Sequence, residues 1–336
     1  MSPRRNVRVL SQCHTLWMRV IATLALLATT ALNSDVPYGS KAPLPIPRVF
    51  APGEISTGDF ESHPAFSPDG KTLYFLKDSP NFTFWTMMIT HFENGKWSSP
   101  TVAPWSGHYR DADPFVTADG KRLYFISDRP VEGKPKEDLD IWFMEWTNGT
   151  WGEPQHLGTP VNSGGNEWFP TIASDGTIYF GSDREGGFGR TDIYRCKLVN
   201  GSYGPAENLG ESINSKFDEF EPMIAPDQSF LIFMASGRPE GKGGGDLYVS
   251  RFREGKWTAA SNLGEPINSR ALEISPKLSP DGKWFFFTST RGAFVGKPLE
   301  RAMSTSEMLQ LLHGPGNGLG DIYQIDTSAL GIDKIQ

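Results

Sequence analysis

Five short apolar runs recur along the chain, and each follows a polar turn. The runs begin at residues 72, 122, 177, 230 and 284 and read TLYFL, RLYFI, TIYFG, FLIFM and WFFFT. A run that is apolar on both faces is typical of a strand packed between neighbouring sheets. The turns read SPDG, TADG, ASDG, APDQ and SPDG, where proline fixes φ and glycine tolerates a positive φ. The pattern predicts five copies of one unit built from short strands.

Each copy opens on an acid, and a complete copy contains four predicted strands. The acid stands three places before a proline, and an aspartate follows that proline by five places, as in Glu167, Pro170 and Asp175. The third strand begins at an aspartate and ends at a hairpin such as Asn148-Gly149, because Asn-Gly is a strong hairpin signal. Asn148 and Asn200 also match glycosylation sequons, but their place at hairpin tips favours the turn interpretation.

The two ends of the repeat array complement each other. The fifth copy stops after Asp321-Ile-Tyr-Gln-Ile without a fourth strand, whereas residues 47–50 have the spacing of one. An N-terminal strand that completes the last blade would remove the exposed edges of an open array. A period of about 50 residues built from short strands indicates a propeller. We therefore predict an all-β fold, a five-bladed β-propeller over residues 47–326, with a C-terminal tail at 327–336.

The N-terminus has the three-part pattern of a secretory signal peptide. Four arginines precede an apolar run over residues 20–31, which is too short to span a bilayer of about 30 Å comfortably. Residues 1–31 are predicted as the signal peptide and residues 32–46 as a linker, and an uncleaved anchor stays open as the alternative. Cys13 precedes the apolar run, so a lipid anchor is not expected. The predicted location is periplasmic or secreted, with no integral membrane span after cleavage.

The charge of the chain excludes two classes of partner. Cleavage after residue 31 would leave 28 basic against 39 acidic residues, a net charge of −11. Such a chain is not expected to bind nucleic acid or an anionic membrane surface. Cys196 would then be the only thiol, and we interpret it as a small buried apolar residue.

The repeat resembles a known family. The pattern E-x-x-P-x-[FI]-S-P-D-G-x-x-[LI]-[YF]-F-x-S-x-R is similar to the TolB-type, WD-like propeller repeat of bacterial periplasmic and envelope proteins, over residues ~47–326. The resemblance implies the propeller fold. It implies less about activity, because such propellers serve as scaffolds, as receptors and occasionally as polysaccharide-degrading enzymes. No G-x-S-x-G nucleophile motif occurs.

Arginine and aspartate recur together at the loop between the second and third strands. The first copy lacks both and has Ser79 and Thr83 instead. Their joint absence predicts that they pair as a clamp within each blade, because bidentate arginine–carboxylate contacts suit that role. The predicted clamps are Arg129 with Asp140, Arg184 with Asp192, Arg238 with Asp246, and Arg291 with Asp321.

A ring of acids is predicted at the mouth of the channel. Two interpretations stay open. One is a cation site, for a metal held by oxygen ligands or for a Lys or Arg side chain of a partner; the other is a structural role in which each acid accepts backbone N–H groups of the neighbouring loop. Since an acid present in every copy indicates a requirement of the fold, we favour the structural role and expect no cofactor. These acids are Glu61, Asp111, Glu167, Glu219 and Glu273.

Residues that differ between copies are the better candidates for ligand binding. Strand alternation places the residue two positions after each acid on the same side as that acid. The candidates are His63, His108, Arg110, Asp113, Trp168 and Glu221. In the last copy, residues 292–319 form an insertion in which 306–313 predict a short helix, and His313 is interpreted as a residue of the helix end.

We predict a non-catalytic binding or scaffold module of the cell envelope. It would be a monomer that recognises an envelope protein or a glycan on an acidic loop face. No nucleophile–base pair or cofactor motif stands out. The rival hypothesis is a carbohydrate-active enzyme, a hydrolase or lyase, with Asp113 and Glu221 as its acid pair. That chemistry needs carboxyl groups about 5–9.5 Å apart. A purely structural domain is the third alternative.

Overall fold

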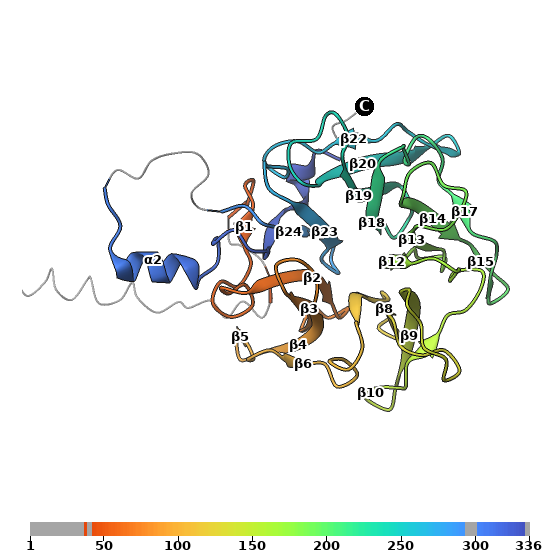
Figure 1. Ribbon diagram of the computed structural model, residues 1–336, viewed down its shortest axis with the longest axis horizontal. Coiled ribbons are helices and arrows are strands. Elements are labelled where there is room, and N and C mark those ends of the chain that lie inside the picture. Colours follow the sequence, from red (N-terminus) through yellow and green to blue (C-terminus); the bar gives the residue numbers. More distant parts are fainter. Residues whose placement is uncertain (1–36, 39–41, 293–300, 333–336) are drawn as a thin grey trace, which may run out of the picture. The chain divides into compact units, whose positions relative to one another are not determined.

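The computed structural model describes residues 37–38, 42–292 and 301–332. The predicted signal peptide, residues 1–31, lies outside the described residues, as do parts of the predicted linker, insertion and tail. The described residues of Val36–Gln336 belong to one compact unit. Figure 1 shows five small sheets arranged around a ring, in the order of the sequence.

Every blade is an antiparallel sheet whose strands follow one another in the chain. Blade 1 contains β2 (Phe60–Phe66), β3 (Thr72–Asp78), β4 (Trp85–Glu93), β5 (Lys96–Trp97) and β6 (Thr101–Val102). Blade 2 contains β7 (Ala112–Val116), β8 (Arg122–Ser127), β9 (Asp140–Thr147), β10 (Thr150–Trp151) and β11 (Gln155–His156). Blade 3 contains β12 (Glu167–Ile172), β13 (Ile178–Ser182), β14 (Asp192–Cys196) and β17 (Glu207–Asn208), with the hairpin β15 (Leu198–Val199) and β16 (Ser202–Tyr203). Blade 4 contains β18 (Asp218–Ile224), β19 (Phe230–Ser236), β20 (Asp246–Arg253), β21 (Lys256–Trp257) and β22 (Ser261–Asn262).

Blade 5 is assembled from both ends of the array. It contains β23 (Glu273–Leu278), β24 (Trp284–Ser289) and β25 (Asp321–Asp326), and its fourth strand is β1 (Arg48–Val49). Strand β1 pairs antiparallel with β25, with Arg48 opposite Gln324 and Val49 opposite Tyr323. The predicted five-bladed propeller and its closure by an N-terminal strand are therefore confirmed.

The apolar runs form the second strands and lie between the blades. Phe75, Phe125, Phe180, Phe233 and Phe286 are each fully buried. Burial on both faces explains why these strands show no alternation of polar and apolar residues. The packing extends into the segment predicted as a linker, where Tyr38 and Leu44 are buried against the same cores. The later part of that segment therefore belongs to the packed unit.

The hairpins and the insertion also follow the local signals in the sequence. Asn148 and Gly149 both have a positive φ, of 54° and 83°, as a two-residue hairpin requires. Helix α2 (Thr305–Leu312) begins at a capping box formed by Ser304 and Glu307, and His313 is its C-cap. A short 3₁₀ helix, η1 (Thr327–Leu330), follows the last strand.

A bulge interrupts the first strand of every blade, directly before its proline. The register shifts between Ser62 and Ala65 in blade 1, and at the same place in the other four. The residue at the bulge has a positive φ of 50–58° in each case, which is uncommon for residues other than glycine. We call these five residues the inner ring: His63, Asp113, Phe169, Glu221 and Ser275.

Candidate functional site: the channel centre and a pocket between blades 1 and 2

The five acids at the start of the first strands, here called the entry acids, are all fully buried. The carboxylate of Glu167 accepts the backbone N–H of Ser163 at 3.0 Å and its hydroxyl at 2.6 Å. Glu61, Glu219 and Glu273 accept the same pair of donors from the residue four places upstream. These contacts are the ones that the structural interpretation predicts, since each carboxylate fastens the loop between two blades.

The predicted pairing of arginine with the third-strand aspartate is wrong. Arg184 Nη2 lies 3.0 Å from Glu167 Oε1, so the arginine at the end of the second strand pairs with the entry acid of its own blade. The same pairing joins Arg129 to Asp111, Arg238 to Glu219 and Arg291 to Glu273. The physical reason is that the guanidinium also donates to the carbonyls of Pro160 and Val161, which hold it beside the buried entry acid.

The third-strand aspartates have a different task. Asp192 accepts the backbone N–H groups of Phe188 and Gly189 and so closes its own loop. The aspartates of blades 4 and 5 do likewise, at Lys242 N–H for Asp246 and Gly316 N–H for Asp321. In blade 2, Asp140 instead contacts Lys136 Nζ at 2.7 Å and His156 Nε2 at 3.0 Å. The two residues therefore hold different loops: Arg184 donates to the Val161 carbonyl in the loop between blades, whereas Asp192 closes the loop between the second and third strands.

Blade 1 obtains its cation from another position. It has Ser79 where the other blades have arginine, and Lys77 Nζ lies 3.2 Å from Glu61 Oε1 instead. Lys77 stands two residues earlier, where blade 2 has Ser127. Every entry acid therefore has a cationic partner, and none of the five presents a free carboxylate at the channel mouth.

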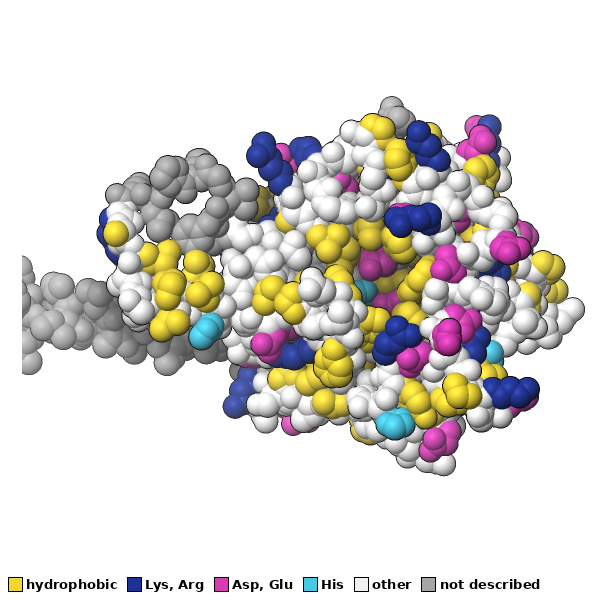
Figure 2. Space-filling model, in the orientation of Figure 1, with side chains coloured by type: hydrophobic (Ala, Val, Ile, Leu, Met, Phe, Trp, Pro, Cys, Tyr) yellow, Lys and Arg dark blue, Asp and Glu magenta, His cyan; other side chains and the backbone are white. Residues whose placement is uncertain are grey.

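The inner ring brings three of the predicted ligand-binding residues together. His63 Nε2 lies 3.2 Å from Asp113 Oδ1 and 3.3 Å from Glu221 Oε1. These side chains come from blades 1, 2 and 4, so the contact reaches across the ring. Figure 2 shows the ring hollowed at its centre, with acidic and histidine side chains at the bottom of the hollow. The three residues are nearly buried, with exposed side-chain fractions of 7–13%.

The second oxygen of each carboxylate holds the backbone of the next blade. Asp113 Oδ2 accepts the N–H of Phe169 at 2.8 Å, and Glu221 Oε2 accepts the N–H of Ser275. The network therefore includes one residue from every blade. Because each oxygen of both carboxylates already has a donor, the two acids act first as structural ties.

The second ring nitrogen of His63, Nδ1, extends the network. Nδ1 lies 2.6 Å from Ser62 Oγ, which donates to Asp78. Since the hydroxyl proton points to Asp78, Nδ1 must donate, and Nε2 faces two acceptors, so His63 carries both protons. Burial alone would lower the pKa of His63, but the neighbouring carboxylates of Asp113 and Glu221 have the larger effect and raise this pKa to about 9. Burial raises the pKa of Asp78 to about 6.

Lys277 is a fourth charged residue of the channel that the sequence analysis missed. It is 6% exposed, and its Nζ lies 4.2 Å from the ring centroid of Phe169. Burial lowers its pKa to about 7. A signal existed, because Lys277 directly follows the proline of the repeat, where the other copies have Ala65, Phe115, Thr171 and Met223. The candidates chosen from the sequence all precede the proline, whereas Lys277 follows it.

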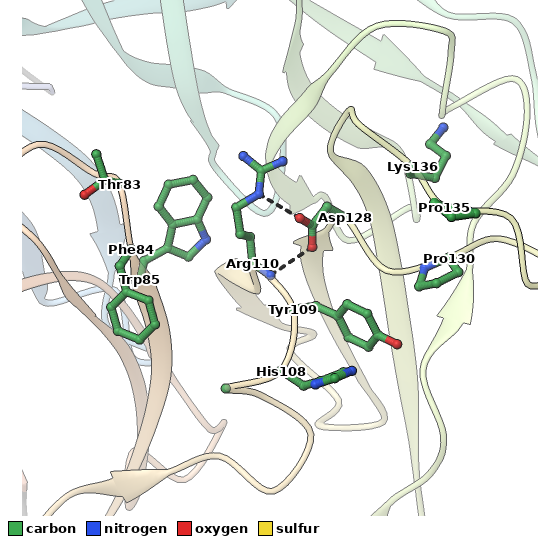
Figure 3. A pocket seen from close by; sticks show the side chains of 11 residues that line it. Thr83, Phe84, Trp85, His108, Tyr109, Arg110, Asp128, Pro130, Pro135 and Lys136 are labelled. Carbon is green, nitrogen blue, oxygen red and sulfur yellow. Dashed lines mark hydrogen bonds and ion pairs between the residues drawn. The ribbon is translucent and has the colours of Figure 1, made fainter.

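Two other candidates, His108 and Arg110, line a pocket on the loop face between blades 1 and 2. This blade 1–2 pocket has a volume of about 300 Å³ and is formed by Thr83–Trp85, Gly107–Arg110, Asp128, Pro130, Pro135 and Lys136. Figure 3 shows Arg110 between Trp85 and Asp128. Its guanidinium carbon lies 5.7 Å from the Trp85 ring centroid, and its Nε donates to Asp128 at 2.7 Å. Phe84 at the rim is 63% exposed.

Trp168 belongs to neither place. It is half-buried and packs edge-on against Phe220 of blade 4, with ring centroids 5.8 Å apart.

Within the described ranges, no three His, Cys, Asp or Glu side chains are arranged to hold a metal ion. The hypothesis of a divalent cation at the channel mouth stays an untested prediction. No helix in the described part of the chain is both long and apolar enough to cross a membrane.

No protein-family model matches the sequence, and no curated protein sequence matches it. Among solved structures, the chain is similar to TolB from Acinetobacter baumannii, with 16% identity and a TM-score of 0.45 over 79% of this chain and 54% of TolB. It is also similar to an oligogalacturonate lyase in complex with manganese, with 16% identity and a TM-score of 0.41 over 78% of this chain and 64% of the lyase. A Dyadobacter fermentans protein of unknown function has 14% identity and a TM-score of 0.43, over 84% of this chain and 85% of that chain.

These similarities are too distant to carry an argument about activity. The chain covers only about half of TolB, so the properties of the whole TolB protein do not transfer to it. The five-bladed propeller that the TolB-type repeat implies is established by the strand order of the structure itself.

Proposed function

We propose that the protein is a non-catalytic binding module of the cell envelope that recognises an envelope protein or a glycan through the blade 1–2 pocket. One observation carries this proposal: the pocket joins aromatic side chains to hydrogen-bonding groups on the loop face. Binding energy concentrates at aromatic and arginine side chains in such places. The location in the periplasm or outside the cell rests on the N-terminal sequence pattern alone.

The charge of the pocket changes the expected partner. The entry acids are buried and paired, so they do not make the loop face acidic. The pocket itself contains Arg110, Lys136 and His108 against Asp128. We therefore expect a partner that offers hydrogen-bond acceptors beside a flat apolar surface, rather than the basic partner that an acidic face would attract.

The test is a binding screen with matched variants. The protein is screened against a glycan array and used to capture envelope proteins, and the affinity for any hit is measured for Arg110→Ala and His108→Ala. The matched control is Arg190→Ala, since Arg190 is exposed on the loop side of blade 3 and also pairs with an aspartate, Asp218. A loss of about tenfold or more in the pocket variants, with no change in the control, supports the proposal. Equal losses in all three variants contradict it.

One observation keeps an enzyme as the second candidate. Because Asp113 and Glu221 contact the same nitrogen of His63, their nearest oxygens lie no further apart than the two contact distances together. This upper limit allows a separation within the range of about 5–9.5 Å that paired carboxylates use in glycoside hydrolysis. New reducing ends or unsaturated products from cell-wall or plant polysaccharides, lost in Asp113→Asn and Glu221→Gln, would favour the enzyme over the binding module.

A further inference from the structure

Lys277 reaches across the channel without finding an acceptor. It stands on β23 of blade 5, yet its Nζ lies over the rings of Phe169 from blade 3 and Phe115 from blade 2, at 4.2 and 5.1 Å from their centroids. Its Nζ is buried and has no hydrogen-bond partner among the described residues, and the same holds for Ser275 Oγ. A buried donor without a partner destabilises the folded state, so native proteins satisfy such groups with water or a ligand.

The neighbouring carboxylates do not meet this need. Asp113 and Glu221 interact with Lys277 through their charges, but their oxygens lie on His63 and on the backbone of Phe169 and Ser275. Each carboxylate oxygen has two lone pairs, so it still has room for one more donor. The channel centre therefore combines free donors, at Lys277 and Ser275, with acceptors that have spare capacity.

The charges of the channel centre select against an ionic ligand. Two groups, His63 and Lys277, can be positive, whereas Asp113, Glu221 and Asp78 are carboxylates above pH 6. The five groups therefore sum to one negative charge when Lys277 is an ammonium and to two when Lys277 is neutral. Neither state attracts an anion, and a cation would face the His63 imidazolium. The aromatic faces of Phe115 and Phe169 add an apolar surface beside these groups.

We propose that the channel centre is a second binding site, for an uncharged, hydroxyl-rich ligand such as a neutral sugar. Its hydroxyl oxygens accept from Lys277 and Ser275, its hydroxyl protons go to Asp113 and Glu221, and its C–H face packs on the phenylalanine rings. A ligand with alternating donors and acceptors satisfies the unpaired groups, which neither an anion nor a hydrocarbon does. This site is separate from the blade 1–2 pocket and does not depend on it.

The test measures direct binding by calorimetry and by ligand-induced shifts in the melting temperature. The neutral probes are D-glucose, D-mannose and N-acetyl-D-glucosamine, and the charged probes of the same ring shape are D-glucuronate and D-glucosamine. We expect saturable binding of at least one neutral sugar and binding of the charged analogues about tenfold weaker or more. Preferred binding of glucuronate, or no saturable binding of any neutral sugar, would overturn the proposal.

Variants locate the binding. Lys277→Met keeps the apolar stem and removes the donor, and Ser275→Ala removes the second donor without changing the backbone. Each should weaken the sugar by about tenfold. The matched control Lys121→Met replaces a lysine whose side chain is 78% exposed and should leave the affinity unchanged. Arg110→Ala tests the blade 1–2 pocket separately, because a loss of sugar affinity in that variant but not in Lys277→Met would place the sugar in that pocket and contradict this assignment. Sugar binding that survives both Lys277→Met and Ser275→Ala contradicts the assignment.

Discussion

The entry acids and the inner ring stand two residues apart on the same five strands, yet they differ in kind. Each entry acid is a carboxylate with a cation beside it, and four of the five bind a loop backbone in the same way. The inner ring shares only its backbone, a bulge with a positive φ before a proline. Its side chains are an imidazole, two carboxylates, a phenyl ring and a hydroxyl. The first set meets a demand of the fold, and the second places different chemistry on one repeated backbone.

This difference separates two meanings of repetition. Where all copies agree in residue and in contact, the residue stabilises the blade. Where copies agree in backbone and differ in side chain, the position is free to carry function. In the inner ring the positive φ is common to all five copies, whereas the side chains differ. The backbone strain is therefore a feature of the fold and does not by itself mark a functional site.

The largest effect is expected from breaking an entry acid. Glu167→Gln removes the charge that balances the buried Arg184, and should lower the free energy of unfolding by about 3–5 kcal/mol. Denaturant unfolding measures it. Asp175→Asn is the control, since Asp175 is exposed in a turn of the same blade, and it should cost less than about 1 kcal/mol. A cost for Glu167→Gln no larger than that of the control would contradict the structural role of the entry acids.

The pairing itself is tested by a double-mutant cycle. Arg184→Met and Glu167→Gln should couple by about 0.5–3 kcal/mol, because the residues are in contact. Arg184→Met and Asp192→Asn should be additive within about 0.5 kcal/mol, since they share no contact. The reverse outcome would restore the clamp that the sequence predicts.

The next largest effect is expected in the inner ring. Asp113→Asn leaves the His63 imidazolium with one carboxylate instead of two and weakens the tie to Phe169. We expect a loss of about 2–3 kcal/mol in the free energy of unfolding. Asp119→Asn in the turn of the same blade is the matched control, with a side chain 58% exposed. If Asp113→Asn unfolds at the same denaturant concentration as this control, Asp113 has no structural role and becomes a catalytic candidate again.

The repeat made the fold predictable to the level of single strands. Third strands begin at Asp140, Asp192, Asp246 and Asp321, as the spacing predicts. Turns, apolar runs and hairpins are local signals, and five copies repeat them. The missing fourth strand of the last copy indicated the closure by β1, because an exposed edge is costly.

The site was less predictable, since its contacts join residues far apart in the chain. That His63, Asp113 and Glu221 face the channel followed from strand alternation, but their meeting at one nitrogen depends on the ring's diameter and on the bulge. The arginine partner was misassigned because two sets of acidic residues, the entry acids and the third-strand aspartates, recur with the same period. Lys277 stands four residues after an entry acid, and only the folded channel shows that it has no acceptor.

The pH dependence of stability sharpens the comparison within the inner ring. The pKa of His63 rises from 6.5 to about 9 on folding, so its contribution is complete below pH 6.5 and is lost as the pH rises through 9. The pKa of Lys277 falls from 10.5 to about 7, so its penalty is relieved as the pH rises from 7 to 10.5. Between pH 7 and 9 the two effects oppose each other.

Replacing either Lys277 or His63 should reveal the pH dependence of stability that the other residue contributes. In Lys277→Met the free energy of unfolding should fall between pH 7 and 9 with a slope of up to about 1.4 kcal/mol per pH unit. In His63→Gln it should rise over the same interval, and in the unaltered protein it should change little. Denaturant titrations at each pH measure these slopes. Equal slopes in all three proteins would show that neither group titrates in this interval.

The smallest effect is expected from the blade that breaks the rule. Lys77 replaces the arginine of the other blades, and its side chain is 30% exposed and shared between Glu61 and Asp59. Such a partly solvated pair contributes about 1 kcal/mol or less, so Lys77→Met should cost less than Arg184→Met. Because Glu61 also accepts the N–H and the hydroxyl of Thr57, it keeps two of its donors in the variant.

The double substitution Lys77→Ser and Ser79→Arg introduces the arginine that the other blades have, and it should restore the stability that Lys77→Met removes. Chemical denaturation of these variants decides the matter: if Lys77→Met costs as much as Arg184→Met, the lysine is a full substitute for the arginine and blade 1 is no exception.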